Sequence, residues 1–367
     1  MNKLKAAIFT LKPKKTIIDI CKRIGLLNNC VLQIDLVNNI LNSEILRRFP
    51  LPKAYQRDIT YEIIKHIEGT GGEVCDELYL YLSQITNAVD SNTRSHIIIT
   101  LPNSLFVKES HDSSFAISKE FAFSFEECNL VGMRPWYACY RLVEWLVYSA
   151  SLDRNIVGSD IIELGSGIGI SSIIPFLLLP VSSICSTDYD PEIIRNLQYN
   201  FEINEISLNL GVAADNNSKE KFARIMCLDW ETIDMSISDE IINPLRNPII
   251  ISSDVIYDDD LTLSFVRTLK CLLVSSYVKK FGCYPKRLTS KLPKDKSIHW
   301  NELLEADFNT NKVYAVSVNT VRNENTIQYF VDCCIYHGLT VSLDSTVIPS
   351  IFDTEFDNST LVFIISC

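Results

Sequence analysis

An aspartate and a tyrosine three residues apart are the residues in this sequence best suited to catalysis. Asp254 and Tyr257 follow an apolar run, 248–253, that is typical of a buried strand. The Asp254 carboxylate can accept hydrogen bonds from an ammonium or amine, while Tyr257 offers a hydroxyl and a ring face that attracts cations. Ser253 ends the same strand and is a candidate ligand contact. The alternative is that Asp254 caps the next helix and Tyr257 packs in the core.

A glycine-rich turn is the second candidate feature. The apolar pair Ile161-Ile162 indicates the end of a buried strand, and an apolar run after the turn predicts a helix. Alternating glycines remove the Cβ atoms that would keep a ligand from the backbone, and the helix N-terminus favours negative groups. On its own the turn is equally compatible with a purely structural role. Its candidate ligand contacts are Glu163, Gly165, Ser166, Gly167 and Gly169.

Three further polar or aromatic residues follow the next expected strands. Asp188 ends the second strand at about the 20-residue offset where an acid binds a ribose diol, unless it caps the helix that Pro191 opens. Asp229 and Trp230 follow the third strand, where the indole can form a wall for an adenine ring or pack as a core aromatic. Because ligands bind beyond the carboxyl ends of parallel strands, these side chains are expected to share one crevice with Asp254.

The elements that position these residues alternate between strands and helices, which predicts an α/β fold. We expect a Rossmann-like, mostly parallel sheet of seven strands in which the last strand is antiparallel. The expected strands lie at about 160–165, 183–188, 224–229, 248–253, 313–318, 339–343 and 361–365. The expected helices lie at about 170–180, 191–203, 260–280 and 323–337. The absence of a helix between the last two strands indicates an antiparallel edge.

Three parts of the chain are expected. Residues 1–94 show helical periodicity and end in a helix that begins near Asp76, residues 95–129 contain short runs typical of a small β element, and residues 130–367 form the α/β domain. The segment 284–312 is rich in Lys, Asn and Pro and is expected to be an exposed insertion. The N-terminal part could be a packing domain or could recruit a partner.

Composition excludes several functional classes. A net charge of -11 argues against a nucleic-acid surface and favours a small molecule or a basic protein segment as partner. The twelve cysteines show no Cys-x-x-Cys pair and indicate reduced thiols in a cytoplasmic protein. No His or Cys spacing indicates a metal site. The apolar run 170–184 is too short, and too interrupted by proline, for a membrane span. The sequence does not give the oligomeric state.

Taken together, these residues resemble the class I, seven-β-strand methyltransferases that use S-adenosylmethionine. The glycine turn matches the family's first motif and Asp188 its ribose-binding position, while Asp254-Val-Ile-Tyr257 is similar to the Asp-x-x-Tyr motif of the protein-lysine branch. The segment Gly132–Trp136 is similar to a Gly-x-x-Thr-Trp motif of that branch, although Pro135 replaces the threonine. Within the branch, the segments 75–79, 227–230 and 321–323 most resemble enzymes that methylate eukaryotic elongation factor 2.

The resemblance implies S-adenosylmethionine as the cofactor and a lysine of a protein, most simply elongation factor 2, as the methyl acceptor. Asp254 would hold and aim the amine, and Tyr257 with Trp136 would form a dry aromatic wall. The implied cofactor contacts are Trp136, Glu163, Gly165, Ser166, Gly167, Gly169, Asp188, Asp229, Trp230 and Ser253.

Three other functions are compatible with parts of the pattern. A nicotinamide-dependent dehydrogenase would have glycine where Ile170 stands. A non-catalytic interaction protein could retain the fold and bind partners through its helical N-terminal part. A nucleic-acid methyltransferase that modifies base amino groups would carry Pro-Pro and an aromatic residue after position 254, where this chain has Val255.

Overall fold

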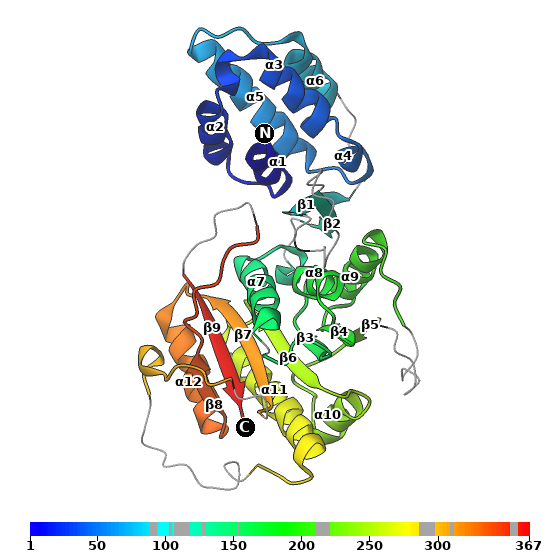
Figure 1. The fold of residues 1–367 in the computed structure, drawn as a ribbon, viewed down its shortest axis with the longest axis vertical. Helices are drawn as coiled ribbons and strands as arrows, with labels where there is room; N and C mark the ends of the chain where they lie inside the picture. The colour runs from blue at the N-terminus through cyan, green and yellow to red at the C-terminus, as the bar shows by residue number, and fades with distance from the viewer. Residues whose placement is uncertain are drawn as a thin grey trace. The chain divides into compact units, whose positions relative to one another are not determined.

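The computed structural model describes residues 1–87, 94–102, 105, 118–126, 130–152, 154–209, 221–285, 298–308, 312–352 and 359–367. The chain divides into two compact units (Figure 1). The first comprises Met1–Glu127 with Ile351–Glu355, and the second comprises Cys128–Ser350 with Phe356–Cys367. All of the candidate site residues belong to the second unit.

The first unit is built mainly from short helices. Its helices are α1 (Asn2–Phe9), α2 (Lys14–Arg23), α3 (Cys30–Asp35), α4 (Glu44–Arg48), α5 (Lys53–Gly69) and α6 (Asp76–Asn87). In α2 the apolar residues Ile17, Ile18 and Cys21 recur at helical spacing and are buried. The periodic stretch from 32 to 46 is not one helix, because a π-helical turn, Leu36–Leu41, interrupts it before α4 begins.

An antiparallel hairpin belongs to the same unit. It consists of β1 (Ser95–Pro102) and β2 (Ser118–Phe125), so the expected small β element is present. The backbone N–H of His96 donates to the carbonyl of Pro50 at 2.9 Å, which ties β1 to the segment before α5. Another of the short apolar runs within 95–129, at 115–117, lies outside the described residues.

The second unit contains a seven-stranded sheet, which confirms the expected fold class. The strand order is β5-β4-β3-β6-β7-β9-β8. The strands are β3 (Asp160–Leu164), β4 (Ser183–Asp188), β5 (Phe222–Cys227), β6 (Pro248–Ser253), β7 (Tyr314–Thr320), β8 (Thr340–Leu343) and β9 (Thr360–Ser366). The last strand, β9, pairs antiparallel with β7 on one side and with β8 on the other. The direct pairing of β8 with β9 at this end of the sheet confirms the expected antiparallel edge.

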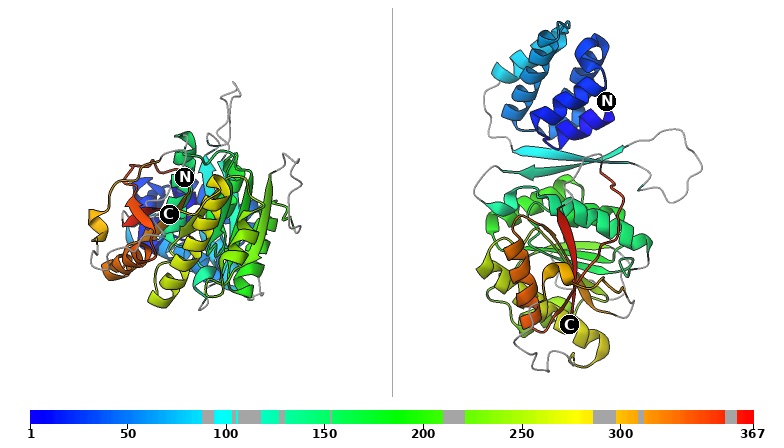
Figure 2. Two further views of the ribbon diagram at one scale, coloured as in Figure 1. Left: turned by 90° about the horizontal axis from the view of Figure 1, so that it is seen from below. Right: turned by 90° about the vertical axis from the view of Figure 1, so that its left-hand side faces the viewer.

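Helices cover both faces of this sheet (Figure 2). The alternation of side chains along β3 gives the two faces different surroundings. Ile162 and Leu164 point into the large apolar core that includes Phe265 of α11 and Phe330 of α12. Glu163 points to the opposite face, where its carboxylate meets the start of α8. The helices of this unit are α7 (Tyr137–Ser151), α8 (Ile170–Leu178), α9 (Pro191–Ile203), α10 (Met235–Ile242), α11 (Asp259–Phe281) and α12 (Glu324–Tyr336).

The helix α7 begins directly after Trp136, its N-cap residue, and is bonded to the segment after β8 near its other end. Farther along, the indole of Trp145 donates to the Asp344 carboxylate at 2.7 Å, and Arg154, just beyond the helix, pairs with the same carboxylate at 2.6 Å. The segment after β8 is therefore bonded to α7 through two buried or nearly buried side chains.

The helix α11 is long and apolar enough by composition to cross a membrane. In the fold it packs against β6, β7, α10 and α12, and its side chains Phe265, Leu269 and Leu272 are fully or almost fully buried in the core. These contacts are those of a core helix.

The described part of the expected 284–312 insertion is not all solvent-exposed loop. Residues 298–308 include a short 3-10 turn, and the N–H of Trp300 donates to Gln328 of α12 at 2.9 Å. Glu305 pairs with Leu343 of β8 in an isolated bridge. This segment therefore covers part of the sheet edge formed by β8.

Candidate active site

The glycine turn after β3 brings two backbone segments into direct contact. Gly167 has φ +54°, and a Cβ atom there would lie 2.8 Å from the carbonyl oxygen of Gly132. A side chain at this position would therefore meet both backbone strain and a collision. The N–H of Gly167 donates to the Asp188 carboxylate at 3.0 Å, so the turn and the end of β4 are fixed to each other.

Asp188 is positioned to accept hydrogen bonds from a ligand. Its carboxylate takes the N–H groups of Gly167 and Tyr189, which leaves acceptor positions open, since a carboxylate offers about four. Burial raises the pKa of Asp188, and these backbone donors oppose the rise. Asp190, rather than Asp188, caps α9 by accepting from Glu192 and Ile193. The helix-cap role that the sequence left open for Asp188 therefore belongs to Asp190, and ribose binding by Asp188 stays a prediction.

A cavity of about 480 Å³ opens at the carboxyl ends of β3, β4, β5 and β6. Its size is in the range of pockets that hold a nucleoside-sized ligand. Ten of the twelve candidate residues line it: Trp136, Gly165, Ser166, Gly167, Asp188, Asp229, Trp230, Ser253, Asp254 and Tyr257.

The other two candidates, Glu163 and Gly169, do not line the cavity, which corrects the expectation of direct ligand contact. The Glu163 carboxylate is completely buried and accepts hydrogen bonds from the hydroxyls of Ser171 and Ser172. Burial raises the pKa of Glu163 to about 7. Gly169 is the residue before α8, where it has φ +89°. Glu163 and Gly169 therefore belong to the structure of the turn and of the start of α8, on the side away from the cavity.

Trp230 both packs in the core and faces the cavity, while its role as an adenine wall stays a prediction. Its ring packs on Phe265 with centroids 5.2 Å apart, so it is attached to the core, and it also lines the cavity. Asp229 beside it accepts from the N–H of Glu231 at 2.9 Å. Trp230 can therefore provide a rigid apolar wall for a flat ring.

The Asp254 carboxylate is surrounded by donors. The N–H and hydroxyl of Thr320 donate to it at 2.8 and 3.1 Å, and the N–H of Ala138 donates at 3.4 Å. Arg322 binds it through two nitrogens at 3.3 and 3.0 Å. The carboxylate side chain is only 2% exposed, and its residue has φ +52°. The helix cap that we considered for Asp254 is instead Asp258, which accepts from Leu261.

Two aromatic side chains, Trp136 and Tyr257, line the same cavity as Asp254. The Trp136 indole N–H donates to the carbonyl of Val131 at 2.9 Å, and the Arg322 guanidinium lies 5.0 Å from the ring centre. Tyr257 is half-exposed at the rim of the cavity. Partial burial, with the carboxylates of Asp188 and Asp258, raises the pKa of its hydroxyl, which therefore stays protonated at neutral pH. A carboxylate and two aromatic rings thus line the same cavity.

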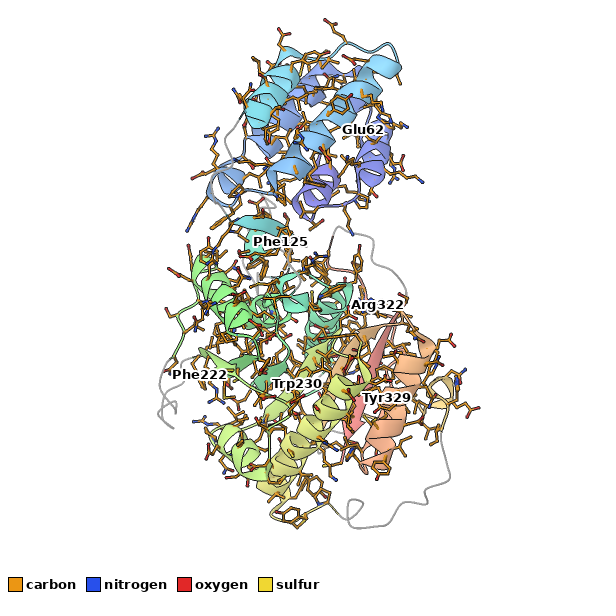
Figure 3. All side chains as sticks on the ribbon, turned by 180° about the vertical axis from the view of Figure 1, so that it is seen from behind. Glu62, Phe125, Phe222, Trp230, Arg322 and Tyr329 are labelled. Atoms are coloured by element: carbon orange, nitrogen blue, oxygen red, sulfur yellow. The ribbon has the colours of Figure 1, made fainter. Side chains whose placement is uncertain are left out.

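Two residues of this region were not among the sequence candidates. Arg322 follows β7 and reaches Asp254 from there (Figure 3). Tyr189, directly after Asp188, also lines the cavity and is 64% exposed. Position at the carboxyl end of a parallel strand is the signal that could have identified both.

This strand order, with a glycine turn after the central strand β3 and an acid at the end of β4, defines a class I, Rossmann-like methyltransferase fold. Residues 118–305, just over half of the chain, match the family described as lysine methyltransferase. The chain belongs to this family, which confirms the resemblance found in the sequence. The same membership supports S-adenosylmethionine as the cofactor. The open backbone at Gly167 and the remaining acceptor positions of Asp188 fit such a group.

Relatives of this chain include two proteins named protein-lysine N-methyltransferase and one uncharacterised protein. The human protein-lysine N-methyltransferase EEF2KMT is 24% identical over 238 residues, which cover 65% of this chain and 66% of the relative. Its mouse counterpart is 27% identical over 220 residues, 59% of each chain. An uncharacterised Dictyostelium discoideum protein is 31% identical over 154 residues, 40% of this chain and 42% of the relative. The chain spans less than two thirds of the length of each of these relatives.

Solved structures show only distant similarity. TYW2 from M. jannaschii, solved in complex with AdoMet, aligns with 9% identity and a TM-score of 0.34, covering 76% of this chain and 86% of that one. A precorrin-6y C5,15-methyltransferase from Geobacter metallireducens aligns with 10% identity and a TM-score of 0.35, covering 67% and 93%. These similarities add nothing to the assignment made above.

Proposed function

We propose that this chain is a protein-lysine N-methyltransferase that uses S-adenosylmethionine, and that its substrate is eukaryotic elongation factor 2. The observation that carries the proposal is a single cavity with two chemically different ends. We assign the glycine turn and Asp188 to the donor end, and Asp254, Tyr257 and Trp136 to the acceptor end; all of these residues line the same cavity. The name of the human and mouse relatives supports the choice of substrate.

The first end suits the donor. S-adenosylmethionine supplies an electrophilic methyl group on a sulfonium. In this chain, the Asp188 carboxylate would accept from a ribose diol, and Trp230 would cover the adenine. Ser166 is held close to the turn, since its hydroxyl accepts from the N–H of Thr187 at 3.1 Å. The residues that bind the donor are thus fixed by the fold itself.

The second end suits a lysine side chain. A free lysine has a pKa near 10.4, so only about one in a thousand is neutral at pH 7. Asp254 would attract and aim the nitrogen, while the rings of Tyr257 and Trp136 would disfavour the hydrated ammonium and tolerate the methylated product. Asp254 is assigned to holding and aiming the nitrogen and not to acting as a strong base. Most of the rate would come from positioning.

The test is methyl transfer to a purified protein. The chain is incubated with radiolabelled S-adenosylmethionine and with elongation factor 2, and mass spectrometry then identifies the modified residue. Label on a lysine of the factor is the expected result. Label that appears only in RNA would instead make the chain a nucleic-acid methyltransferase. If the donor binds but no macromolecule is labelled, a non-catalytic binding role replaces the proposal.

The cell compartment is part of the same proposal. The described cysteines are all free, and several, including Cys21, Cys185 and Cys334, are buried thiols. Such thiols are compatible with the cytoplasm, where glutathione keeps them reduced and where elongation factor 2 would be available. Fractionation of cells that express a tagged chain tests this assignment.

A further inference from the structure

A cation already occupies the carboxylate that the proposed mechanism assigns to the substrate. Five donor atoms converge on Asp254, and two of them are nitrogens of the Arg322 guanidinium. A carboxylate offers about four acceptor positions. With Arg322 in place, Asp254 therefore has no position left for a lysine nitrogen.

Arg322 is the donor that can leave. Two of the other donors are backbone N–H groups, of Ala138 in α7 and of Thr320 at the end of β7, and the third is the Thr320 hydroxyl. The Arg322 side chain, by contrast, is 44% exposed and lies on the segment between β7 and α12. It does not line the cavity. Its departure would leave the three other donors to keep the carboxylate oriented.

The position of the guanidinium matches the needs of a lysine side chain. It lies between the Asp254 carboxylate and the face of Trp136, with its central carbon 5.0 Å from the ring centre. An ammonium, whether or not it carries methyl groups, is attracted by the same two partners. A second cation cannot share this space with Arg322.

We propose that Arg322 holds the position of the substrate lysine until the substrate arrives, and that lysine binding displaces it. This inference rests on the proposed function and adds a specificity-determining residue to it. Only a cation that competes with the guanidinium gains access to Asp254, so a neutral side chain of similar length is rejected. Each productive encounter must first break the Asp254–Arg322 ion pair.

The cost of this exchange sets the size of the effect. The Arg322 side of this ion pair is 44% exposed to solvent, and three neutral donors still bind the buried Asp254 carboxylate when the guanidinium leaves. The unpaired form is therefore populated at a useful level. The apparent affinity for the substrate equals the intrinsic affinity multiplied by the fraction of molecules in which the Asp254–Arg322 pair is broken. Removing the guanidinium should therefore lower KM for the protein substrate about five-fold.

The kinetic experiment compares wild type with Arg322→Met and Arg322→Lys, using elongation factor 2 as substrate. Met retains a similar length without charge, and Lys retains a cation. We expect KM to fall about five-fold in Arg322→Met and less in Arg322→Lys, with kcat changed less than two-fold in both. Arg267→Met, which removes an exposed arginine of α11, is the matched control and should leave both constants unchanged. A raised KM or lost turnover in a folded Arg322→Met protein would overturn the inference.

A binding experiment keeps the inference testable without turnover. The probe is n-butylammonium, the side chain of lysine without its backbone, titrated while the indole N–H of Trp136 is followed by NMR. The chain has four tryptophans, so that spectral region is sparse. We expect about five-fold tighter binding to Arg322→Met than to wild type, and unchanged affinity for S-adenosylmethionine in both.

The two experiments fail in different ways. Equal binding of n-butylammonium to wild type and Arg322→Met means that Arg322 does not compete for the cation position, and overturns the inference. Tighter binding to the variant without methylation of elongation factor 2 by either protein supports the cation position and rejects the proposed substrate.

Discussion

The two ends of the cavity are built in different ways. At the donor end, a backbone N–H of the turn after β3 donates to a side chain at the end of the neighbouring strand β4, as Gly167 does to Asp188. Glu163, the acid behind this turn, is completely buried. At the acceptor end, a buried carboxylate is matched by a half-exposed arginine that comes from 68 residues farther along the chain. The donor end is therefore rigid and sequence-local, whereas the acceptor end depends on a charge pair that can rearrange. Four changes test this contrast.

The largest effect is expected from Asp254→Ala, which removes the centre of the acceptor end. Loss of a preorganised group aimed at the reacting nitrogen should lower kcat/KM for the protein substrate by roughly two to three orders of magnitude. Affinity for S-adenosylmethionine should stay within two-fold, because the donor end is untouched. Initial rates and calorimetric titration check the two halves of this prediction. Unchanged methyl transfer would remove Asp254 from the mechanism.

The next effect concerns stability and belongs to the donor end. The pKa of Glu163 is raised from 4.5 to about 7 in the folded protein. Between these values the unfolded chain loses the proton and the folded protein retains it, so the contribution of Glu163 to stability falls as pH rises through this window. From pH 5 to 7 the loss should be roughly 2 kcal/mol.

The variant Glu163→Gln cannot ionise and should lack this part of the pH dependence. Urea unfolding of wild type and variant at pH 5 and pH 7 measures the difference between them. Glu202→Gln, on the exposed side of α9, is the matched control. Parallel pH profiles for wild type and Glu163→Gln would contradict the buried, proton-retaining carboxyl.

A smaller effect is expected from Gly167→Ala. The added Cβ would lie 2.8 Å from the Gly132 carbonyl, so the turn must shift away from its position beside Asp188. We expect affinity for S-adenosylmethionine to fall roughly tenfold, since a shifted backbone loses contacts on which a close approach depends. Gly158→Ala is the matched control, because Gly158 has φ +73° but no atom near the added Cβ. Equal affinity in both variants would mean that the collision is unimportant.

The smallest effect is expected from Tyr257→Phe. The ring remains and only the hydroxyl is lost, at a side chain that is 49% exposed. Turnover should fall about three-fold, with little change in binding of the donor, because a solvent-accessible hydroxyl contributes weakly. Tyr257→Ala, which also removes the aromatic wall, should cost more. If the two variants are equal, the hydroxyl accounts for the whole contribution of Tyr257.

The same contrast explains what the sequence could predict. The strands expected at 160–165, 183–188 and 248–253 contain short apolar stretches followed by polar residues, and the structure contains β3, β4 and β6 at these places. The glycine turn and Asp188 are likewise encoded within short segments. The helix α10 was not predicted, because Met235–Ile242 is short and offers little periodic pattern. The position of β9 in the sheet depends on its pairing with β7, which lies far away in the sequence, so no local pattern predicts it.

The details of the site were harder to predict for the same reason. Glu163 was placed correctly on its strand, but the alternation along β3 turns its carboxylate toward Ser171 and Ser172 and away from the cavity. The pairing of Arg322 with Asp254 requires β6 and β7 to be neighbours, and no spacing in the chain encodes it. Local patterns therefore predicted which residues surround the cavity, and the fold determined which of them pair with each other.

The attachment of α7 near both ends gives this helix a mechanical role. Trp136 starts it at the wall of the cavity, and Trp145 and Arg154 fasten its other part to Asp344. A helix of this length is about 22 Å long and moves as a stiff rod. Helix α7 therefore connects the wall of the cavity to the loop after β8. Asp344 is thus connected to the indole at the cavity wall through the length of one helix.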